Sequence, residues 1–334
     1  MLERVRWGIL GPGSIAHKFV AGLSLIPDAE VVAVGSRSIE RANAFADEYG
    51  IPHRYGSYQE LVDDADVDVI YVATPHSLHR EHTLLCLQGG KPVLCEKPMA
   101  VNAREVAEMI QVAGNKNLFL MEAMWTRFLP VWVKVRELLA KGVIGEPRML
   151  TADFGSRAAK DPEHRLFAPH LAGGALLDVG VYPVSLASMV FGQAPEDIAT
   201  LAHLGDTGVD EQGAYILRYE RGQLAILSSA VRTKTPQEAR IMGTEGSIYV
   251  PNFWRGTSLR LEISGREPED IPLPFPGNGY SFEALEVMSC LREGKLESDT
   301  MPWSESLQIA ETMDRIRASW GLQYPMELED SASP

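Results

Sequence analysis

The sequence is poor in cysteine and in positive charge. It has three cysteines among 334 residues, Cys86, Cys95 and Cys290, an odd number without the spacing of metal ligands. They are expected to be reduced, mostly buried thiols, and no metal site is expected. The net charge of −14 argues against nucleic acid or an anionic membrane as a partner, although it is compatible with a locally basic pocket.

The sequence is also expected to lack targeting and membrane segments. Residues 1–10, MLERVRWGIL, lack the long apolar core and the small-residue cleavage site of a signal peptide. No apolar run is expected to be long enough to span a bilayer, and there is no repeat or low-complexity tract. We therefore expect a cytoplasmic protein, and its length suits two domains rather than one.

The N-terminal part of the chain alternates between strand and helix patterns, as βαβ units require. Continuous apolar runs separated by amphipathic segments predict a parallel sheet covered by helices on both faces, as in a Rossmann domain. The predicted strands are 5–10, 31–36, 67–74, 92–97 and 117–123, and the predicted helices are 14–26, 39–50, 77–90 and 102–115.

The pattern of predicted elements changes after residue 123, and closely spaced strands with short turns predict an antiparallel sheet. The predicted elements are helices at 128–141, 174–190, 281–293 and 304–319, and strands at 146–155, 197–204, 213–219, 223–230, 238–250 and 257–263. The last dozen residues, 323–334, are polar and are expected to be loose. We therefore predict an α/β protein with a nucleotide-binding domain over 1–123 and an α+β domain over 124–334.

The stretch GPGSIA at 11–16 follows the first predicted strand and begins a helix. In this G-x-G-x-x-A pattern Gly11 allows a tight turn, Gly13 lets the backbone approach a pyrophosphate, and Ala16 lets the helix pack close to the strand. The first helical residues, Ser14 and Ile15, then offer free N–H groups to the anion. The alternative is a glycine turn without a ligand, but the strand before it and the helix after it predict dinucleotide binding.

The end of the second strand indicates which dinucleotide binds. An NAD site usually has an acid there that bonds the ribose 2′-hydroxyl, and the stretch GSRSIER at 35–41 has none at that place. Ser36 and Arg37 can instead bind a 2′-phosphate, and Arg41 can add positive charge. A solvated helix N-terminus is the alternative, and Glu40 weakens the positive field. We expect NADP, with NAD less favoured.

The stretch ATPHSLH at 73–79 follows a third strand, and ligands lie beyond the carboxyl ends of a parallel sheet. Thr74 and Pro75 are therefore candidate cofactor contacts. His76 and His79 are expected to line the nicotinamide side, although each histidine is otherwise an ordinary loop or cap residue.

The next strand ends on Glu96, Lys97 and Pro98. Glu96 is expected to accept hydrogen bonds from a ribose hydroxyl, and Lys97 is expected to work on a ligand in the same crevice. The alternative is a surface turn with a solvated ion pair.

The stretch GGALLDVGVYPVS at 173–185 carries two polar side chains in apolar surroundings. Asp178 and Tyr182 are four residues apart and share one face if the segment is helical, and such groups are expensive to bury without partners. Gly180 lowers helix propensity by about 1 kcal/mol relative to alanine, or it lets another group approach closely. The alternative is a helix whose polar side chains bond to neighbouring loops.

Three motifs together, GILGPGSIA at 8–16, CEKPM at 95–99 and GGALLDVGVY at 173–182, resemble those of the glucose–fructose oxidoreductase and inositol dehydrogenase family. The resemblance covers nearly the whole chain in order. Within that family the chain is most similar to the dimeric dihydrodiol dehydrogenase branch, which is also described as NADP-dependent D-xylose 1-dehydrogenase. The stretches that carry this closer resemblance are 54–61, 93–106, 118–130, 173–182 and 207–210.

The resemblance implies a Rossmann domain and a substrate-binding second domain with a large open, mostly antiparallel sheet that mediates dimerisation. It implies that Lys97 lies in the active site, with Asp178 and residue 182 opposite the nicotinamide. Many members have histidine at the last position, where this chain has Tyr182. Arg148 also matches the branch and is a candidate for substrate or cofactor binding, or a surface arginine. Trp125 and Phe128 are candidate walls of the substrate cleft, or simple packing residues.

The resulting hypothesis is hydride transfer between NADP and a hydroxyl carbon of a small polyhydroxylated molecule, a sugar or diol. Tyr182 is proposed to take the hydroxyl proton, with the charge of Lys97 lowering the phenol pKa, and Asp178 to orient Lys97 or the substrate. In the competing assignment Lys97 is itself the acid and base. A redox-neutral glycosidase that keeps bound NAD, and an NADP-sensing regulator without chemistry, are the alternative functions. We expect a homodimer.

Overall fold

The chain folds into two compact units in the computed structural model, which describes residues 3–331. The first unit comprises the chain up to Phe128 together with Pro276–Leu307, and the second comprises Leu129–Phe275 together with the chain from Gln308 onward. The sequence analysis put the boundary after residue 123 and left the whole C-terminal part in the second domain. The structure instead returns 276–307 to the first unit, because the helix over 280–293 packs on the first helix of the chain.

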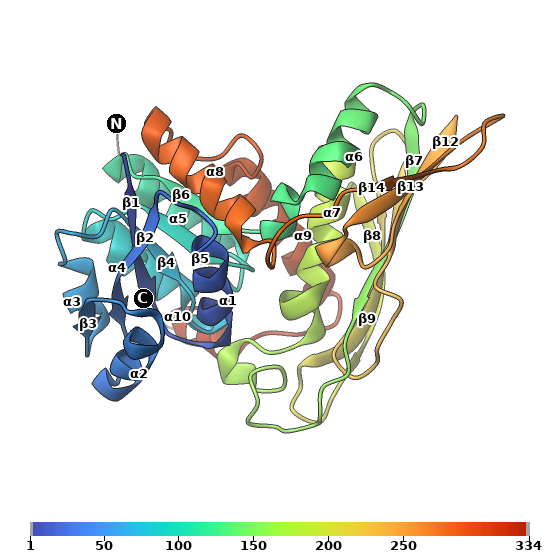
Figure 1. Ribbon diagram of the computed structural model, residues 1–334. Coiled ribbons are helices and arrows are strands. Elements are labelled where there is room, and N and C mark those ends of the chain that lie inside the picture. Colours follow the sequence, from blue (N-terminus) through green and yellow to red (C-terminus); the bar gives the residue numbers. More distant parts are fainter. Residues whose placement is uncertain (1–2, 332–334) are drawn as a thin grey trace. The chain divides into compact units, whose positions relative to one another are not determined.

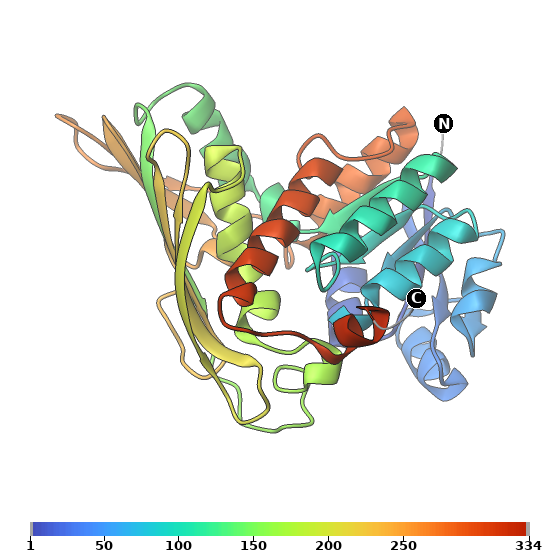
Figure 2. The same cartoon turned by 180° about the vertical axis from the view of Figure 1, so that it is seen from behind.

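The first unit is built on a six-stranded parallel sheet with the order β3-β2-β1-β4-β5-β6, which confirms the predicted Rossmann topology. Helices α1 and α8 lie side by side on one face, and α4 and α5 lie side by side on the other (Figures 1 and 2). The strands are β1 Val5–Leu10, β2 Ala29–Gly35, β3 His53–Tyr55, β4 Val69–Val72, β5 Val93–Glu96 and β6 Leu120–Ala123; the helices are α1 Ser14–Leu23, α2 Ile39–Tyr49, α3 Tyr58–Val62, α4 His79–Gln88, α5 Ala103–Lys116 and α8 Tyr280–Glu293.

The order of the central strands reverses between β1 and β4, and ligands bind at such a switch point. Strands β4, β5 and β6 are buried along their whole length, as their mostly apolar sequences predict. Their carboxyl ends, at Val72, Glu96 and Ala123, lie at one edge because the strands are parallel. The segments that carry the motifs at 11–16, 73–79 and 95–99 therefore meet at that edge.

The second unit is built on an eight-stranded sheet with the order β14-β13-β12-β11-β7-β10-β9-β8, which confirms the predicted large, mostly antiparallel sheet. Strands β7 and β10 pair in parallel, while the other neighbours are antiparallel. The strands are β7 Pro147–Gly155, β8 Asp197–Leu204, β9 Asp210–Arg218, β10 Leu224–Ala230, β11 Ala239–Gly243, β12 Gly246–Val250, β13 Ser258–Ile263 and β14 Glu269–Pro272; the helices are α6 Pro130–Ala140, α7 Val181–Phe191, α9 Trp303–Ala318, which begins in the first unit, and α10 Pro325–Ser331.

The two faces of this sheet differ in burial. Helices α6 and α7 lie over one face (Figure 1), where side chains such as Tyr215 and Leu227 are fully buried. The other face, here called the open face, presents the alternate residues of the same strands. Its side chains include Ile216, Ile226 and Leu201, of which Leu201 is 83% exposed.

The C-terminal segment is ordered as far as the structure describes it, so the expectation that 323–334 is loose was wrong for most of its length. Tyr324 is fully buried, and its backbone N–H donates to Glu327 at the start of α10. The side chain of Arg317 binds both carboxylate oxygens of Glu327 at 2.6 Å. A buried aromatic ring and a bidentate ion pair hold a segment whose composition alone suggests disorder.

The helical stretch Pro169–Phe191 is long and apolar enough to cross a membrane by length and composition, so the expectation that no run reaches that length was wrong. Of its most apolar window, 83% is buried inside the structure. The packing of α7 against β7 and β10 accounts for this burial. The stretch therefore has the surroundings of a core helix.

Candidate active site

The turn after β1 has the shape that a pyrophosphate requires. Gly11 has a φ of +91°, and a Cβ there would lie 3.0 Å from the side chain of Thr74. Gly13 caps α1 in an extended conformation, and a Cβ there would lie 3.8 Å from the carbonyl oxygen of Ala73. Among the described residues, the backbone N–H groups of Ser14 and Ile15 have no hydrogen-bond partner. The residues present therefore fit the anion of a dinucleotide at this helix N-terminus.

Basic and aromatic side chains lie around the end of β2. Ser36 is nearly buried and its hydroxyl accepts from the N–H of Ser38, while Arg37 and Arg41 are exposed. Burial raises the pKa of Tyr58, and the charges of Arg37 and Arg41 oppose this rise, which places the phenol near both guanidinium groups. The sequence analysis did not single out Tyr58, because a tyrosine at a helix start carries no motif.

His82 lies between Tyr58 and Thr74, which follows β4. Its ring packs edge-on against Tyr58 at a centroid distance of 4.6 Å, and its Nδ1 lies 3.0 Å from the hydroxyl of Thr74. Burial and the nearby charge of Arg37 lower the pKa of His82 to about 4, so this ring is neutral. Thr74 is thereby fixed beside the glycine turn, while Pro75 starts the short 3-10 turn His76–Leu78.

His79 has a different place from the one expected. Its ring is fully buried, and Nδ1 and Nε2 each lie 2.8 Å from a carbonyl oxygen, of Pro98 and Thr74 respectively. Burial lowers the pKa of His79 to about 4. The ring thus links the loops after β4 and β5 and leaves no exposed surface for a ligand, whereas His76 retains 9% exposure and packs near it.

The end of β5 places Glu96 in a buried acidic cluster. Glu96 accepts a short hydrogen bond from the hydroxyl of Tyr71 and a 3.1 Å bond from the N–H of Lys97. The carboxyl of Glu283, from α8, is fully buried and has no hydrogen-bond partner among the described residues. Burial, and after it the charge of Glu96, raise the pKa of Glu283 well above its usual value.

A second buried acid supports the same turn from β6. Glu122 accepts a 3.0 Å bond from the N–H of Met99, two residues after Lys97. Burial raises the pKa of Glu122 to about 7, although the Ser306 hydroxyl, the Met99 N–H and the charge of Arg127 oppose the rise. The sequence analysis missed Glu122, because an acid inside an apolar strand gives no sign of the backbone group that it meets.

In the second unit, Asp178 and Tyr182 lie on one continuous helical segment, as predicted. A π-helical turn over Leu176–Gly180 leads directly into α7, and both residues are buried. Asp178 binds the guanidinium of Arg165 at 2.7 Å. Such single π turns are frequent at functional sites.

Aromatic side chains surround Tyr182. The ring of Phe154, near the end of β7, lies 5.2 Å from that of Tyr182 and stacks on that of Trp254 at 5.3 Å. Gly180 does allow a close approach: a Cβ there would lie 2.6 Å from the hydroxyl of Tyr215. The sequence analysis missed Phe154 and Trp254, since they come from segments far apart in the chain.

Three other predicted site residues remain. Trp125 is 2% exposed and stacks on Tyr280 at 4.5 Å, and Phe128 is likewise buried; both residues belong to the first unit. Arg148, near the start of β7, donates to Glu146 and to the carbonyl of Arg221. At about 3.3 Å per residue it lies about 20 Å along β7 from Phe154. The structure therefore does not bring Arg148 together with Asp178 and Tyr182.

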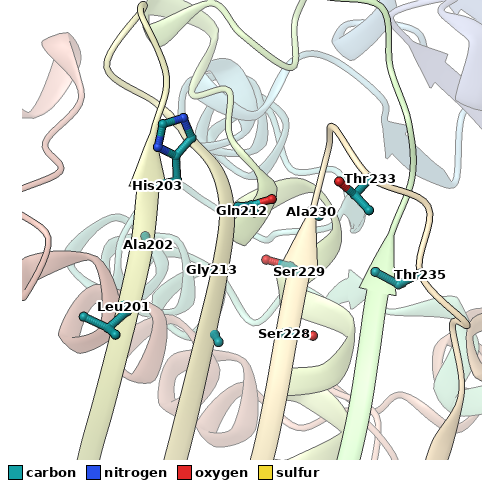
Figure 3. A pocket seen from close by; sticks show the side chains of 11 residues that line it. Leu201, Ala202, His203, Gln212, Gly213, Ser228, Ser229, Ala230, Thr233 and Thr235 are labelled. Carbon is teal, nitrogen blue, oxygen red and sulfur yellow. The ribbon is translucent and has the colours of Figure 1, made fainter.

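A pocket of about 440 Å³ lies along β8, β9 and β10 in the second unit (Figure 3). Its lining includes His203, Gln212, Thr233 and Thr235, but neither Asp178 nor Tyr182. The pocket is therefore separate from the candidate catalytic residues.

His53, Asp64 and Asp66 form a group whose ligand atoms lie close enough to hold a metal ion. Asp64 already accepts bonds from His53 and Tyr55, while Asp66 pairs with Arg6. These hydrogen bonds and the ion pair with Arg6 explain why the three side chains lie together without a metal ion.

Comparison with known families identifies both units. Residues 5–124 match the model of the "Oxidoreductase family, NAD-binding Rossmann fold", and residues 132–249 match the "GFO/IDH/MocA C-terminal domain". The chain belongs to the GFO/IDH/MocA oxidoreductase family. The predicted family is thereby confirmed, and the chain is an NAD(P)-binding dehydrogenase that acts on hydroxyl groups.

Relatives with assigned names match over nearly the whole chain. A trans-1,2-dihydrobenzene-1,2-diol dehydrogenase of Xenopus tropicalis is 43% identical over 331 residues, 96% of this chain and 99% of the relative. The human protein of the same name is 40% identical over 332 residues, with 97% and 99% coverage.

Solved structures extend the comparison to the fold. The aldose-aldose oxidoreductase from Caulobacter crescentus, complexed with glycerol, superposes with a TM-score of 0.87 at 26% identity, covering 96% of this chain and 98% of that one. A 3-ketoreductase from Actinomadura kijaniata, in complex with TDP-benzene and NADP, gives a TM-score of 0.82 at 26% identity, with 94% and 97% coverage.

The buried acid at Glu122 predicts a pH-dependent stability. Its pKa in the folded state lies above the unfolded value, so its contribution to stability is fully present below pH 4 and is lost as the pH rises through 7. Glu122→Gln keeps an acceptor for Met99 but cannot ionise. We expect the thermal midpoint of the variant, relative to the unsubstituted protein, to rise between pH 5 and pH 8, by the equivalent of about 2 kcal/mol.

The control is Glu81→Gln, which makes the same change at an exposed position of the same unit. Its midpoint relative to the unsubstituted protein should stay constant over this pH range. Parallel pH profiles for Glu122→Gln and the unsubstituted protein would contradict the assignment.

Proposed function

We propose that this protein is a cytoplasmic, NADP-dependent dehydrogenase that transfers a hydride between the nicotinamide and a hydroxyl carbon of a small sugar or diol. The substrate is of the trans-1,2-dihydrodiol or D-xylose type. The observation that carries the proposal is the 43% identity, over 96% of the chain, with trans-1,2-dihydrobenzene-1,2-diol dehydrogenase. The three free, buried cysteines are consistent with a reducing compartment.

The choice of NADP rests on the end of β2. No acid occupies the position that would bond a ribose 2′-hydroxyl, and Arg37 and Arg41 stand exposed at that place. Arginine binds phosphate through a planar fork of donors, which favours a 2′-phosphate. The 3-ketoreductase, which has a similar fold, was solved with NADP.

Each candidate catalytic residue is assigned by the chemistry of its side chain. A bound nicotinamide would supply the hydride acceptor. Lys97 and Tyr182 are the two groups able to take the hydroxyl proton, and we favour Tyr182 with Lys97 as the stabilising charge. Asp178, held by Arg165, is suited to accept a hydrogen bond from a substrate hydroxyl. Glu96 and Glu122 hold the backbone on both sides of Lys97 and Pro98.

We further propose that the open face of the second unit binds a second copy of the chain. Leu201, Ile216 and Ile226 are exposed on this face, and Ile216 and Ile226 pair across β9 and β10. Exposed apolar side chains on a broad sheet typically mark a protein interface. Sedimentation should give the mass of two chains, and a single-chain mass at micromolar concentration would exclude this dimer.

The first test is nicotinamide absorbance with NADP⁺ and NAD⁺, each against D-xylose, D-glucose, inositol and a cyclic trans-diol. We expect NADP⁺ reduction with xylose or the diol, and a weaker response with NAD⁺. Arg37→Ala should weaken NADPH binding about tenfold or more relative to NADH, because a charged hydrogen bond contributes about 1.5–3 kcal/mol.

Arg54→Ala is the matched control, since it removes the same charge from β3 but pairs only with Asp47 among the described contacts. A preference for NADH in the unsubstituted protein would contradict the role of Arg37. Nicotinamide that stays bound through purification, together with no turnover of any alcohol, would favour a redox-neutral hydrolase.

The proton acceptor is tested by a pair of variants. If Tyr182 takes the proton, Tyr182→Phe should lower kcat by about 10²–10⁴-fold, the usual range for a general acid or base. Lys97→Met should also be strongly impaired because the positive charge is gone. A loss below about tenfold for Tyr182→Phe, together with an inactive Lys97→Met, would assign the proton to Lys97.

A further inference from the structure

The segment that carries Asp178 and Tyr182 begins at an unusual turn. Ala172 has a φ of +55° and Gly174 a φ of +122°, both in the region that side chains disfavour. The N–H of Gly174 donates to the carbonyl of Leu166 at 2.9 Å. The turn therefore needs support from outside its own residues, because a strained backbone persists only where its surroundings over-determine it.

Asp210, the first residue of β9, supplies part of that support. Its Oδ2 accepts a 2.6 Å bond from the N–H of Leu176, the first residue of the π-helical turn, which has no side-chain cap of its own. A Cβ at Gly174 would lie 2.2 Å from Oδ1 of Asp210, so this close approach requires glycine. The side chain of Asp210 is fully buried, and within the described residues it forms no ion pair.

A stable helix start does not require this arrangement. A neutral asparagine or serine would also accept the N–H of Leu176 without placing a carboxyl group in the core. Burial raises the pKa of Asp210 to about 7, which expresses that cost. A buried carboxyl group at residue 210 therefore costs more free energy than capping the N–H of Leu176 alone would require.

Tyr324 supports the same turn from the C-terminal segment. Its hydroxyl donates to the carbonyl of Gly173 at 2.8 Å, and the ring is fully buried. Glu327 accepts the N–H of Tyr324 at 2.9 Å, and Arg317 holds Glu327 while its guanidinium lies 5.5 Å from the ring of Tyr324. The contacts with Glu327 and Arg317 therefore hold Tyr324 in place, and its hydroxyl binds Gly173.

We propose that Asp210 and Tyr324 are positioning residues for the proposed reaction: together they fix the Gly173–Gly174 turn, and through it the places of Asp178 and Tyr182. This inference rests on the proposed function for its kinetic consequence only. Neither side chain has exposed surface with which to touch a substrate. Their effect travels through the backbone from Gly173 to Tyr182.

The test uses the full-length protein and three variants. Tyr324→Phe removes only the hydroxyl that meets Gly173, Asp210→Ala removes the acceptor of Leu176, and Asp210→Asn keeps an acceptor. We expect Tyr324→Phe and Asp210→Ala to lower kcat about tenfold or more, because small displacements of catalytic groups are costly. The Kd for NADP⁺ should stay within about twofold. Asp210→Asn should retain most of the activity.

Amide hydrogen exchange supplies a readout that does not depend on activity. Exchange at residues 174–185 should speed up in Tyr324→Phe and Asp210→Ala while the rest of the second unit stays protected. The matched control is Tyr219→Phe, at another buried tyrosine of this unit whose hydroxyl makes no hydrogen bond within the described residues. It should change neither kcat nor exchange at 174–185.

Each outcome decides the proposal. Unchanged exchange at 174–185 in Tyr324→Phe would overturn it, whether or not kcat falls, since the effect would not run through this segment. Faster exchange with unchanged kcat would also overturn it, because positioning would then have no catalytic consequence. If the unsubstituted protein turns over no substrate, the proposed function fails, and the exchange experiment still decides whether Asp210 and Tyr324 hold the turn.

Discussion

Buried carboxylates that accept backbone N–H groups hold the turns that carry the candidate catalytic residues. A turn that leaves a buried strand has donors that neither the sheet nor water can satisfy, and an unpaired buried N–H is costly. Glu96 and Glu122 accept these donors on both sides of Lys97 and Pro98. Asp210 does the same for the π-helical turn in the second unit.

This support has an electrostatic cost that the fold tolerates. A carboxyl group taken from water prefers its neutral form, so burial raises the pKa of Glu122 and of Asp210 to about 7. Glu283 lies close to Glu96 without a hydrogen-bond partner among the described residues. Active regions commonly concentrate such perturbed groups, whereas a structure selected for stability alone would avoid them.

Much of the fold and part of the site could be predicted from local sequence. The spacing in GPGSIA needs only a strand before it and a helix after it, and the structure has both around Gly11 and Gly13. A helix over the segment of Asp178 and Tyr182 was likewise expected, and the structure has one there. By contrast, the return of 276–307 to the first unit could not be predicted, because that assignment depends on contacts between segments more than 250 residues apart.

The sequence by itself determined the two-domain class, the family and the side chains that carry the proposed chemistry, because these follow from short motifs and local periodicity. Only the tertiary structure decided what holds those side chains. In the structure His79 is buried between two carbonyl groups, and Arg148 lies far along β7 from Phe154 and Tyr182. Glu122 and Asp210 accept hydrogen bonds from backbone N–H groups of distant segments. The physical reason is that a hydrogen bond between distant segments depends on where the chain folds back, and local residue patterns do not encode that distance.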